Sequence, residues 1–128
     1  MTRVLLADDH ALVRDGLRHI LKGASGFEVV GEASDSASTI ALIRASAADV
    51  LVLDLSMPGR NGVELIKQIK EEGHMVVFST HQLEIADDVA DHIVFMNKGR
   101  NVGDGSTEEF RQQFGSLHAA FHHSLGLK

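Results

Sequence analysis

The strongest constraint on the fold is a regular alternation of short apolar runs with segments of helical periodicity. Each run has the length and the flanking residues of a buried strand. The expected strands are residues 3–7, 27–31, 50–55, 75–79 and 93–96. Parallel strands in one sheet need helical crossovers, and those crossovers place helices on both faces of the sheet. We therefore expect an α/β fold, a three-layer αβα sandwich with a five-stranded parallel sheet.

Two features after the fifth run indicate how the chain continues. Residues 97–100, Asn-Lys-Gly-Arg, are a hairpin-type turn, so residues 101–103 are expected to return as a short antiparallel edge strand. Ser106 and Glu109 have the spacing of a capping box, which predicts the start of a helix. We expect one long last helix, whose apolar stripe is Phe110, Phe114, Leu117, Phe121 and Leu125.

Composition limits the classes of function. The 128 residues are 44% hydrophobic and 23% charged, which suits a single soluble domain over residues 1–128. The net charge of −6 gives no overall attraction for nucleic acid or an anionic membrane. The chain has no cysteine, no apolar run as long as a membrane span and no signal-like start. We expect a cytoplasmic protein without nucleic-acid or membrane partners.

Three carboxylates fall where the expected strands end. Asp8 and Asp9 follow the first strand and Asp54 lies near the end of the third, at the sheet edge where ligands of such folds bind. Carboxylates this close repel one another unless a cation neutralises them, and oxygen ligands of this kind suit Mg²⁺. Asp54 is then the candidate nucleophile, forming an acyl phosphate. The hydroxyl of Ser79, which ends the fourth strand, is placed to hydrogen-bond a phosphoryl oxygen.

The first half of the chain, about residues 1–68, resembles the receiver domain of two-component response regulators, especially those with helix-turn-helix output domains. The resemblance is carried by residues 4–10, 13–17 and 49–59. It implies a flavodoxin-like sheet of order 2-1-3-4-5, with Asp54 as the phosphoacceptor. It also implies Mg²⁺ held by Asp8, Asp9, Asp54 and the backbone carbonyl of Ser56. The expected phosphodonor is a histidine kinase or a small acyl phosphate.

The receiver pattern changes in the second half of the chain. Ser79 supplies the hydroxyl residue that a receiver has after its fourth strand. A receiver also carries a lysine after its fifth strand, usually followed by an acidic residue or proline. Here Lys98 is followed by Gly99-Arg100 and lies 19 residues after Ser79, closer than that pattern implies. Lys98 is nevertheless the candidate to neutralise the phosphoryl group.

Residues 69–128 resemble instead the C-terminal part of ABC-transporter nucleotide-binding domains. Residues 72–81 resemble the strand that leads to the switch histidine, residues 83–92 the helix after it, and residues 93–105 the final strand and hairpin. By this resemblance His81 faces a nucleotide phosphate. The chain lacks a Gly-x-x-x-x-Gly-Lys-Ser/Thr loop and a carboxylate directly after Asp54, so no ATP hydrolysis is expected.

Each candidate residue also has a plainer structural interpretation. Asp8 and Asp9 are suited to capping the first helix, and Asp54 to ending a strand. Lys98 is equally well explained as a solvated lysine in a turn. His81 either caps the helix that follows it or lies exposed.

Two partial resemblances in one chain favour a fusion of fragments, joined within the third helix between Val63 and His74. We therefore interpret the chain as an engineered chimeric scaffold without a selected function, and not as an enzyme. Whether Asp54 retains Mg²⁺-dependent phosphoryl acceptance is left open. The alternative is a natural two-component receiver domain that is phosphorylated by a histidine kinase.

Overall fold

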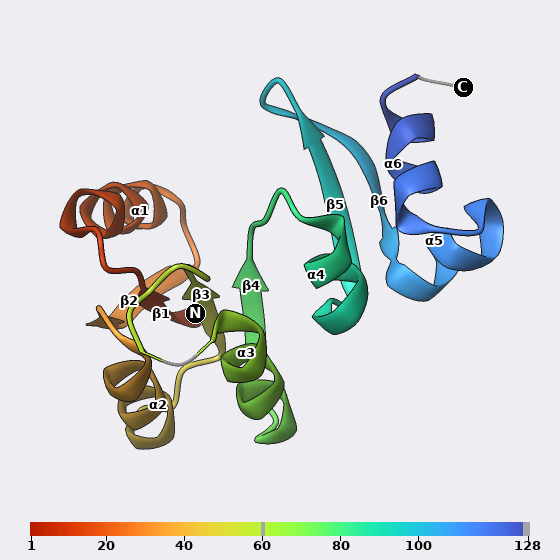
Figure 1. Cartoon of the computed structure of the whole chain (residues 1–128). Coiled ribbons are helices and arrows are strands. Elements are labelled where there is room, and N and C mark those ends of the chain that lie inside the picture. Colours follow the sequence, from red (N-terminus) through yellow and green to blue (C-terminus); the bar gives the residue numbers. More distant parts are fainter. Residues whose placement is uncertain (60, 127–128) are drawn as a thin grey trace. The chain divides into compact units, whose positions relative to one another are not determined.

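The computed structural model describes residues 1–59 and 61–126. It divides the chain into two compact units, Met1–Ser79 and Thr80–Lys128, each with its own sheet (Figure 1). In the described part of the chain, no helix combines the length and the apolar character that crossing a membrane requires.

The first unit is a parallel α/β sandwich. Its elements are β1 (Thr2–Ala7), α1 (Ala11–Gly23), β2 (Phe27–Ala33), α2 (Ser36–Ala45), β3 (Val50–Leu53), α3 (Gly62–Glu71) and β4 (Met75–Phe78). The four strands are parallel and have the order β2-β1-β3-β4. Figure 1 shows α1 on one face of this sheet and α2 and α3 on the other. The first four predicted strands and the start of the predicted order are therefore confirmed.

The core of the first unit lies between the sheet and its helices. The fully buried large apolar side chains come from β1, β3 and α3: Leu5, Leu6, Leu51, Leu65, Ile66 and Ile69. Residues 4–7 of β1 and the whole of β3 are continuous apolar runs, as expected where a parallel strand is covered on both faces. Burial of these side chains supplies most of the stability of the unit.

Burial on the α1 face of the sheet decreases from β1 towards β4. Leu6, Val52 and Val77 are aligned in register across β1, β3 and β4, and so share this face. Leu6 is completely buried, whereas Val77 is 46% exposed. None of the residues of α1, all of which the structure describes, is buried, and Ile20 on its apolar stripe is 67% exposed.

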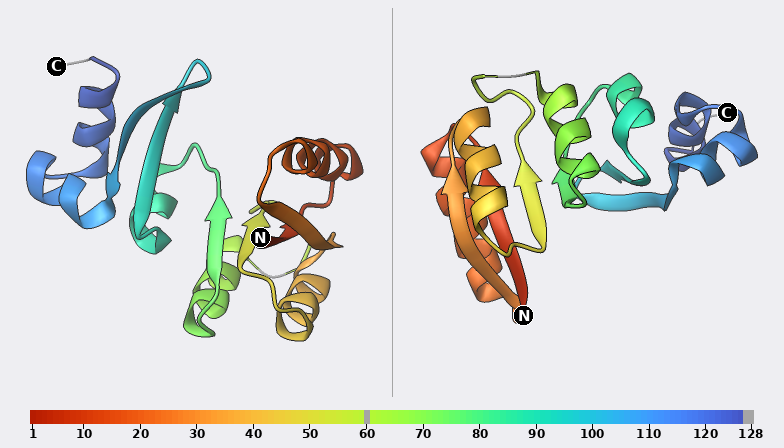
Figure 2. Two further views of the ribbon diagram at one scale, coloured as in Figure 1. Left: turned by 180° about the vertical axis from the view of Figure 1, so that it is seen from behind. Right: turned by 90° about the horizontal axis from the view of Figure 1, so that it is seen from below.

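The second unit is a hairpin packed against helices. Its elements are α4 (Leu83–Val89), β5 (His92–Asn97), β6 (Arg100–Ser106), α5 (Thr107–Phe114) and α6 (Leu117–Ser124). One face of β5 contributes Ile93 and Phe95 to a core that also contains Phe110 and Leu117. Figure 2 draws the ribbons of the hairpin and of its helices from two further sides. The rings of Phe95 and Phe110 lie 5.0 Å apart, centroid to centroid, in a tilted arrangement. This unit therefore has an apolar core of its own.

The prediction of a fifth parallel strand is wrong. Among the described residues β5 pairs only with β6, in an antiparallel two-stranded sheet. The turn between these strands is formed by Lys98 (φ 51°) and Gly99 (φ 76°), the backbone that a tight hairpin turn requires. So short a turn gives β5 a neighbouring partner at little cost in loop-closure entropy. The predicted hairpin and return strand are confirmed, and the return strand is longer than predicted.

The prediction of one long last helix is also wrong. The chain forms α5 and α6, separated at Gly115, which has a φ of 86° and ends α5. Ser116 then starts α6, where its hydroxyl accepts a hydrogen bond from the N–H of Ala119 at 3.1 Å. The predicted cap at the start of α5 is confirmed, because Ser106 Oγ accepts from the N–H of Glu109 at 3.0 Å.

The loop after β3 has a constrained backbone at Gly59, and a substitution there tests this constraint. Gly59 has a φ of +115°, and a Cβ there would lie 2.6 Å from Ser36 Oγ. We expect Gly59→Ala to lower the free energy of unfolding by about 1–3 kcal/mol, measured by urea denaturation. Gly23→Ala is the control, because a Cβ at Gly23 meets nothing within 4 Å and alanine favours a helix. A Gly59→Ala protein as stable as the parent would contradict this expectation.

Candidate functional site

The backbone of the sheet brings Asp8, Asp9 and Asp54 together, and we call these three residues the acidic cluster. Ala7 and Leu53 are in register on the adjacent strands β1 and β3, so Asp8 and Asp54 follow at the same sheet edge. The N–H of Asp54 donates to the carbonyl of Ala7 at 2.8 Å. Carboxylate oxygens of the cluster lie within 4.8 Å of one another, as the sequence predicted.

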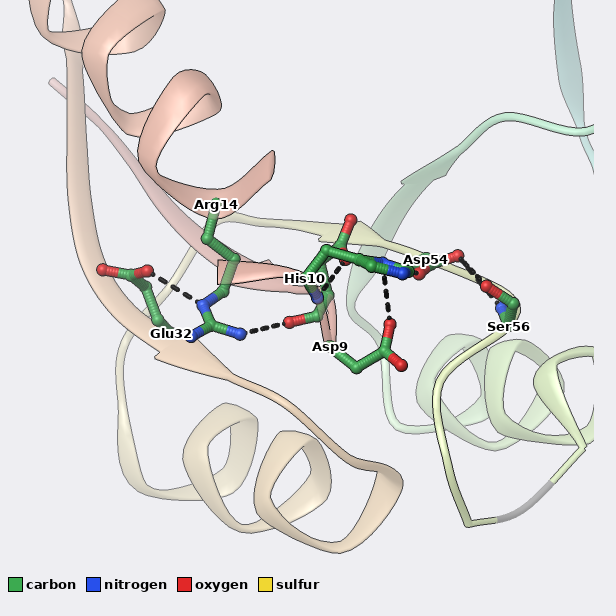
Figure 3. A network of polar contacts seen from close by, with 7 residues as sticks. Asp9, His10, Arg14, Glu32, Asp54 and Ser56 are labelled. Carbon is green, nitrogen blue, oxygen red and sulfur yellow. Dashed lines mark hydrogen bonds and ion pairs between the residues drawn. The ribbon is translucent and has the colours of Figure 1, made fainter. Parts of the chain in front are cut away.

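His10 is part of the same site, although it is not among the site residues predicted from the sequence. Its Nδ1 lies 3.1 Å from Asp8 Oδ1, 3.0 Å from Asp9 Oδ1 and 3.8 Å from Asp54 Oδ2 (Figure 3). The hydrogen bond to Asp8 and the charge of Asp9 raise the pKa of His10 above its ordinary value. A protonated imidazole would therefore balance part of the negative charge of the cluster.

Asp54 is held in its ionised form. Its Oδ1 accepts hydrogen bonds from the backbone N–H of Ser56 at 3.0 Å and from the Ser56 hydroxyl at 2.8 Å. Burial raises the pKa of Asp54, but the two Ser56 donors, the charge of His10 and a hydrogen bond with Asp9 outweigh it, so the net shift is downward. The side chain is 22% exposed, so a reactant can reach it.

Ion pairs between α1 and β2 fix the start of α1 beside the cluster. Arg14 Nη1 donates to the carbonyl of Asp8 at 2.5 Å, and its Nε donates to Glu32 Oε1 at 3.2 Å (Figure 3). Arg18 pairs with the other oxygen of Glu32. These contacts tie the segment that carries Asp8, Asp9 and His10 to the neighbouring strand.

The other predicted site residues are divided between the two units: Ser79 belongs to the first, and His81 and Lys98 belong to the second. Ser79 follows Phe78, which is in register with Leu53, so Ser79 and Asp54 leave the sheet at the same edge. His81 is exposed, two residues before α4, whose N-cap is Gln82. Lys98 is exposed in the turn between β5 and β6. His81 and Lys98 thus belong to the second unit.

The donor set of the acidic cluster fits a hard divalent cation. Three carboxylates from two neighbouring strands offer oxygen ligands, and their partial exposure leaves room for bound water. Asp8, Asp9 and Asp54 would hold Mg²⁺, which would neutralise their mutual repulsion and attract an incoming phosphoryl group. The contacts of Ser56 in the structure run through its N–H and hydroxyl, and its carbonyl as a metal ligand stays a prediction.

A family model for the response regulator receiver domain matches residues 4–95. The chain belongs to the response regulator receiver family. Receiver domains are signalling modules rather than classical enzymes, in agreement with the expectation from sequence. The matched range includes the acidic cluster and continues through α3, β4 and α4 into β5.

Individual relatives support the same family. Over 69 residues the chain is 48% identical to the response regulator UvrY of Escherichia coli K12, which covers 54% of this chain and 32% of that protein. It is 39% identical over 84 residues to the nitrate/nitrite response regulator NarL of the same organism, covering 63% of this chain and 39% of NarL. The chain thus spans about a third of the length of the curated relatives it matches.

Solved structures of response regulators superimpose on this chain and agree with a receiver fold. The RcsB response regulator of Salmonella typhimurium superimposes with a TM-score of 0.67 at 35% identity, covering 71% of this chain and 50% of that one. The isolated receiver domain of RcsB, solved with the phosphomimetic BeF₃⁻, gives a TM-score of 0.63 at 36% identity and covers 70% of each chain. The predicted resemblance to receivers is confirmed, and these matches give no support to an ABC-transporter origin or to engineering.

The charge balance at His10 gives a prediction about pH. In the metal-free protein we expect the imidazole of His10 to titrate above the ordinary pKa of 6.5. Because the folded pKa is raised, the stabilisation from these contacts is complete below about pH 6.5 and is lost as the pH rises through the folded value. Replacing Asp8 by Asn removes the largest cause of the raised pKa of His10. The pH midpoint of the His10 titration should therefore fall in this variant.

The measurement is an NMR titration of the imidazole resonances. Asp15→Asn is the matched control, because Asp15 lies on α1 but pairs with Arg18 instead of His10. A His10 midpoint at or below 6.5 in the parent, or an equal change in both variants, would show that Asp8 does not set this pKa.

Proposed function

We propose that this chain acts as a phospho-accepting signalling module, in which Asp54 takes a phosphoryl group in a Mg²⁺-dependent reaction. The donor is a histidine kinase or a small acyl phosphate. The observation that carries the proposal is the acidic cluster, which converges at the end of β3 within the receiver match. The isolated receiver domain of RcsB was solved in the presence of a phosphomimetic, which is consistent with this chemistry.

The two oxygens of Asp54 are suited to different roles. Oδ1 is occupied by two hydrogen bonds from Ser56, which fix the carboxylate plane. Oδ2 lies 3.8 Å from His10 Nδ1 and accepts neither of the Ser56 hydrogen bonds, and we assign the attack to it. A bond forms between Oδ2 and the phosphorus atom of the donor. The bond from phosphorus to the leaving group breaks, and the leaving group departs with that electron pair as the aspartyl phosphate forms.

Further residues are assigned by analogy and by position. Ser79, at the same sheet edge, donates its hydroxyl to a phosphoryl oxygen. Lys98 as the neutralising cation, His81 as a phosphate-facing residue and the carbonyl of Ser56 as a metal ligand stay predictions from sequence. Cytoplasmic localisation stays a prediction as well.

The comparisons favour the natural receiver hypothesis over the engineered chimeric scaffold, because the receiver match extends to residue 95. A fragment boundary near residue 68 stays a prediction, and so does a single domain over residues 1–128. The ABC-transporter resemblance of residues 69–128 stays a hypothesis about sequence origin.

Phosphoryl acceptance is tested by mass spectrometry after treatment with acetyl phosphate and Mg²⁺. We expect an adduct of about 80 Da on the parent, lost in Asp54→Asn and lost when Mg²⁺ is removed with EDTA. Asp49→Asn is the control, because Asp49 precedes the same strand and accepts a hydrogen bond from the N–H of Arg3 instead. A folded parent that gains no adduct would refute the proposal.

The role of Ser79 is tested by the rate of the same reaction. Loss of one hydrogen bond to the transferring group costs about 1 kcal/mol, so we expect Ser79→Ala to slow adduct formation about five- to tenfold. Ser46→Ala is the control, since the Ser46 hydroxyl donates to the carbonyl of Leu42 at the end of α2. An unchanged rate in Ser79→Ala would show that Ser79 makes no hydrogen bond to the transferring phosphoryl group.

A further inference from the structure

We propose that His10 is a fourth ligand of the cation site, so that the site binds transition-metal ions that accept nitrogen, such as Co²⁺, Ni²⁺ and Zn²⁺, more tightly than Mg²⁺. This inference deepens the proposed function, because it concerns the cation of the same acidic cluster. It does not depend on whether Asp54 accepts a phosphoryl group.

The spacing of the four donor atoms suits one ion. Two ligands about 2.1 Å from a metal are about 3.0 Å apart when they lie at right angles and about 4.2 Å apart when they lie opposite each other. His10 Nδ1 lies 3.0 and 3.1 Å from oxygens of Asp9 and Asp8, and 3.8 Å from Asp54 Oδ2. A single ion among these atoms can therefore contact the nitrogen and all three carboxylates after small movements of the side chains.

The backbone of His10 is held in place before any ion binds. Its N–H donates to Asp8 Oδ1 at 2.8 Å, and its carbonyl accepts from the N–H groups of Val13 and Arg14, both at 3.1 Å. His10 is the N-cap residue of α1, and Arg14 also donates to the carbonyl of Asp8. Only side-chain rotation is left to adjust, so little conformational entropy is lost when the ring binds a metal.

The ring is also accessible, as a ligand for an exchangeable cation must be. The side chain of His10 is 64% exposed. The imidazole lies between the side chains of Asp9 and Asp54 in Figure 3. An ion can reach the ring nitrogen from solvent without any opening of the core.

The identity of the donors then selects the ion. Mg²⁺ prefers oxygen ligands and retains bound water, so the carboxylates alone satisfy it. Imidazole nitrogen suits Co²⁺, Ni²⁺ and Zn²⁺, whose affinity for such sites rises along the first-row series. A nitrogen among three carboxylates therefore adds a ligand for these ions and none for Mg²⁺.

The same short distances also suit hydrogen bonds from a protonated ring to the carboxylates. In that arrangement His10 would be a counter-charge that a metal ion displaces, and it would weaken the binding of every cation. The two roles predict opposite effects of removing the ring, and this opposition makes the test decisive.

The experiment measures Co²⁺ binding by visible absorption and Mg²⁺ binding by calorimetry, on the full chain. We expect the parent to bind Co²⁺ at least about tenfold more tightly than Mg²⁺, and His10→Gln to lower Co²⁺ affinity about tenfold or more. The affinity for Mg²⁺ should stay within about twofold in the same variant. His19→Gln is the matched control, because His19 is an exposed histidine on α1. Circular dichroism checks that each variant folds.

A spectroscopic measurement reports the ligand directly. In the parent, electron spin-echo modulation of bound Mn²⁺ should show coupling to a directly bound imidazole nitrogen, and His10→Gln should lose it while His19→Gln keeps it. Equal Co²⁺ affinity in His10→Gln and in the parent overturns the proposal. Tighter Co²⁺ binding in His10→Gln overturns it as well and assigns His10 the counter-charge role.

The outcomes separate this proposal from the proposed function. A parent that binds Mg²⁺ and gains the phosphoryl adduct, but binds Co²⁺ no more tightly, overturns the His10 assignment alone. A parent that shows Co²⁺ binding dependent on His10 supports the assignment even if no adduct forms on Asp54. A parent that binds neither ion overturns both the cation site and the role of His10.

Discussion

The site depends on the position of β1 between β2 and β3. The N–H of Asp8 donates to the carbonyl of Ala33 in β2, and the N–H of Asp54 donates to the carbonyl of Ala7 in β1. These two hydrogen bonds at the carboxyl ends of three strands decide where the acidic side chains leave the sheet. The contacts of the candidate site, including the Ser56 donors and the Arg14–Glu32 pair, lie at this edge and depend on it.

Mutual repulsion is the main cost of this arrangement, and the structure offsets it locally. Three carboxylates at this spacing disfavour full ionisation. His10 supplies positive charge at the cluster when its imidazole is protonated, and Ser56 directs two donors to Asp54. The same groups that make the metal-free site tolerable therefore keep Asp54 ionised for nucleophilic attack. Charge balance and reactivity have one physical origin here.

Much of the first unit could be predicted from the sequence, because its apolar runs alternate with segments of helical periodicity, and the first and third runs end at aspartate. The partner of β5 could not be, since a short run such as Ile93–Met96 has the same composition in a parallel strand and in a hairpin. The break at Gly115 was missed because the apolar stripe keeps its helical period across it. His10 was missed for another reason: its role depends on the direction of its side chain, which residue order does not encode.

The division into two units affects the order in which the chain can assemble. The hairpin β5–β6 closes through a two-residue turn, so its contacts are local and cost little loop entropy. The pairing of β1 with β3 joins segments about 46 residues apart, as the Arg3–Asp49 hydrogen bond shows. Long-range pairing of this kind is slow to form. The acidic cluster exists only once β1 and β3 are paired, so the chain has no cation site before this long-range pairing has formed.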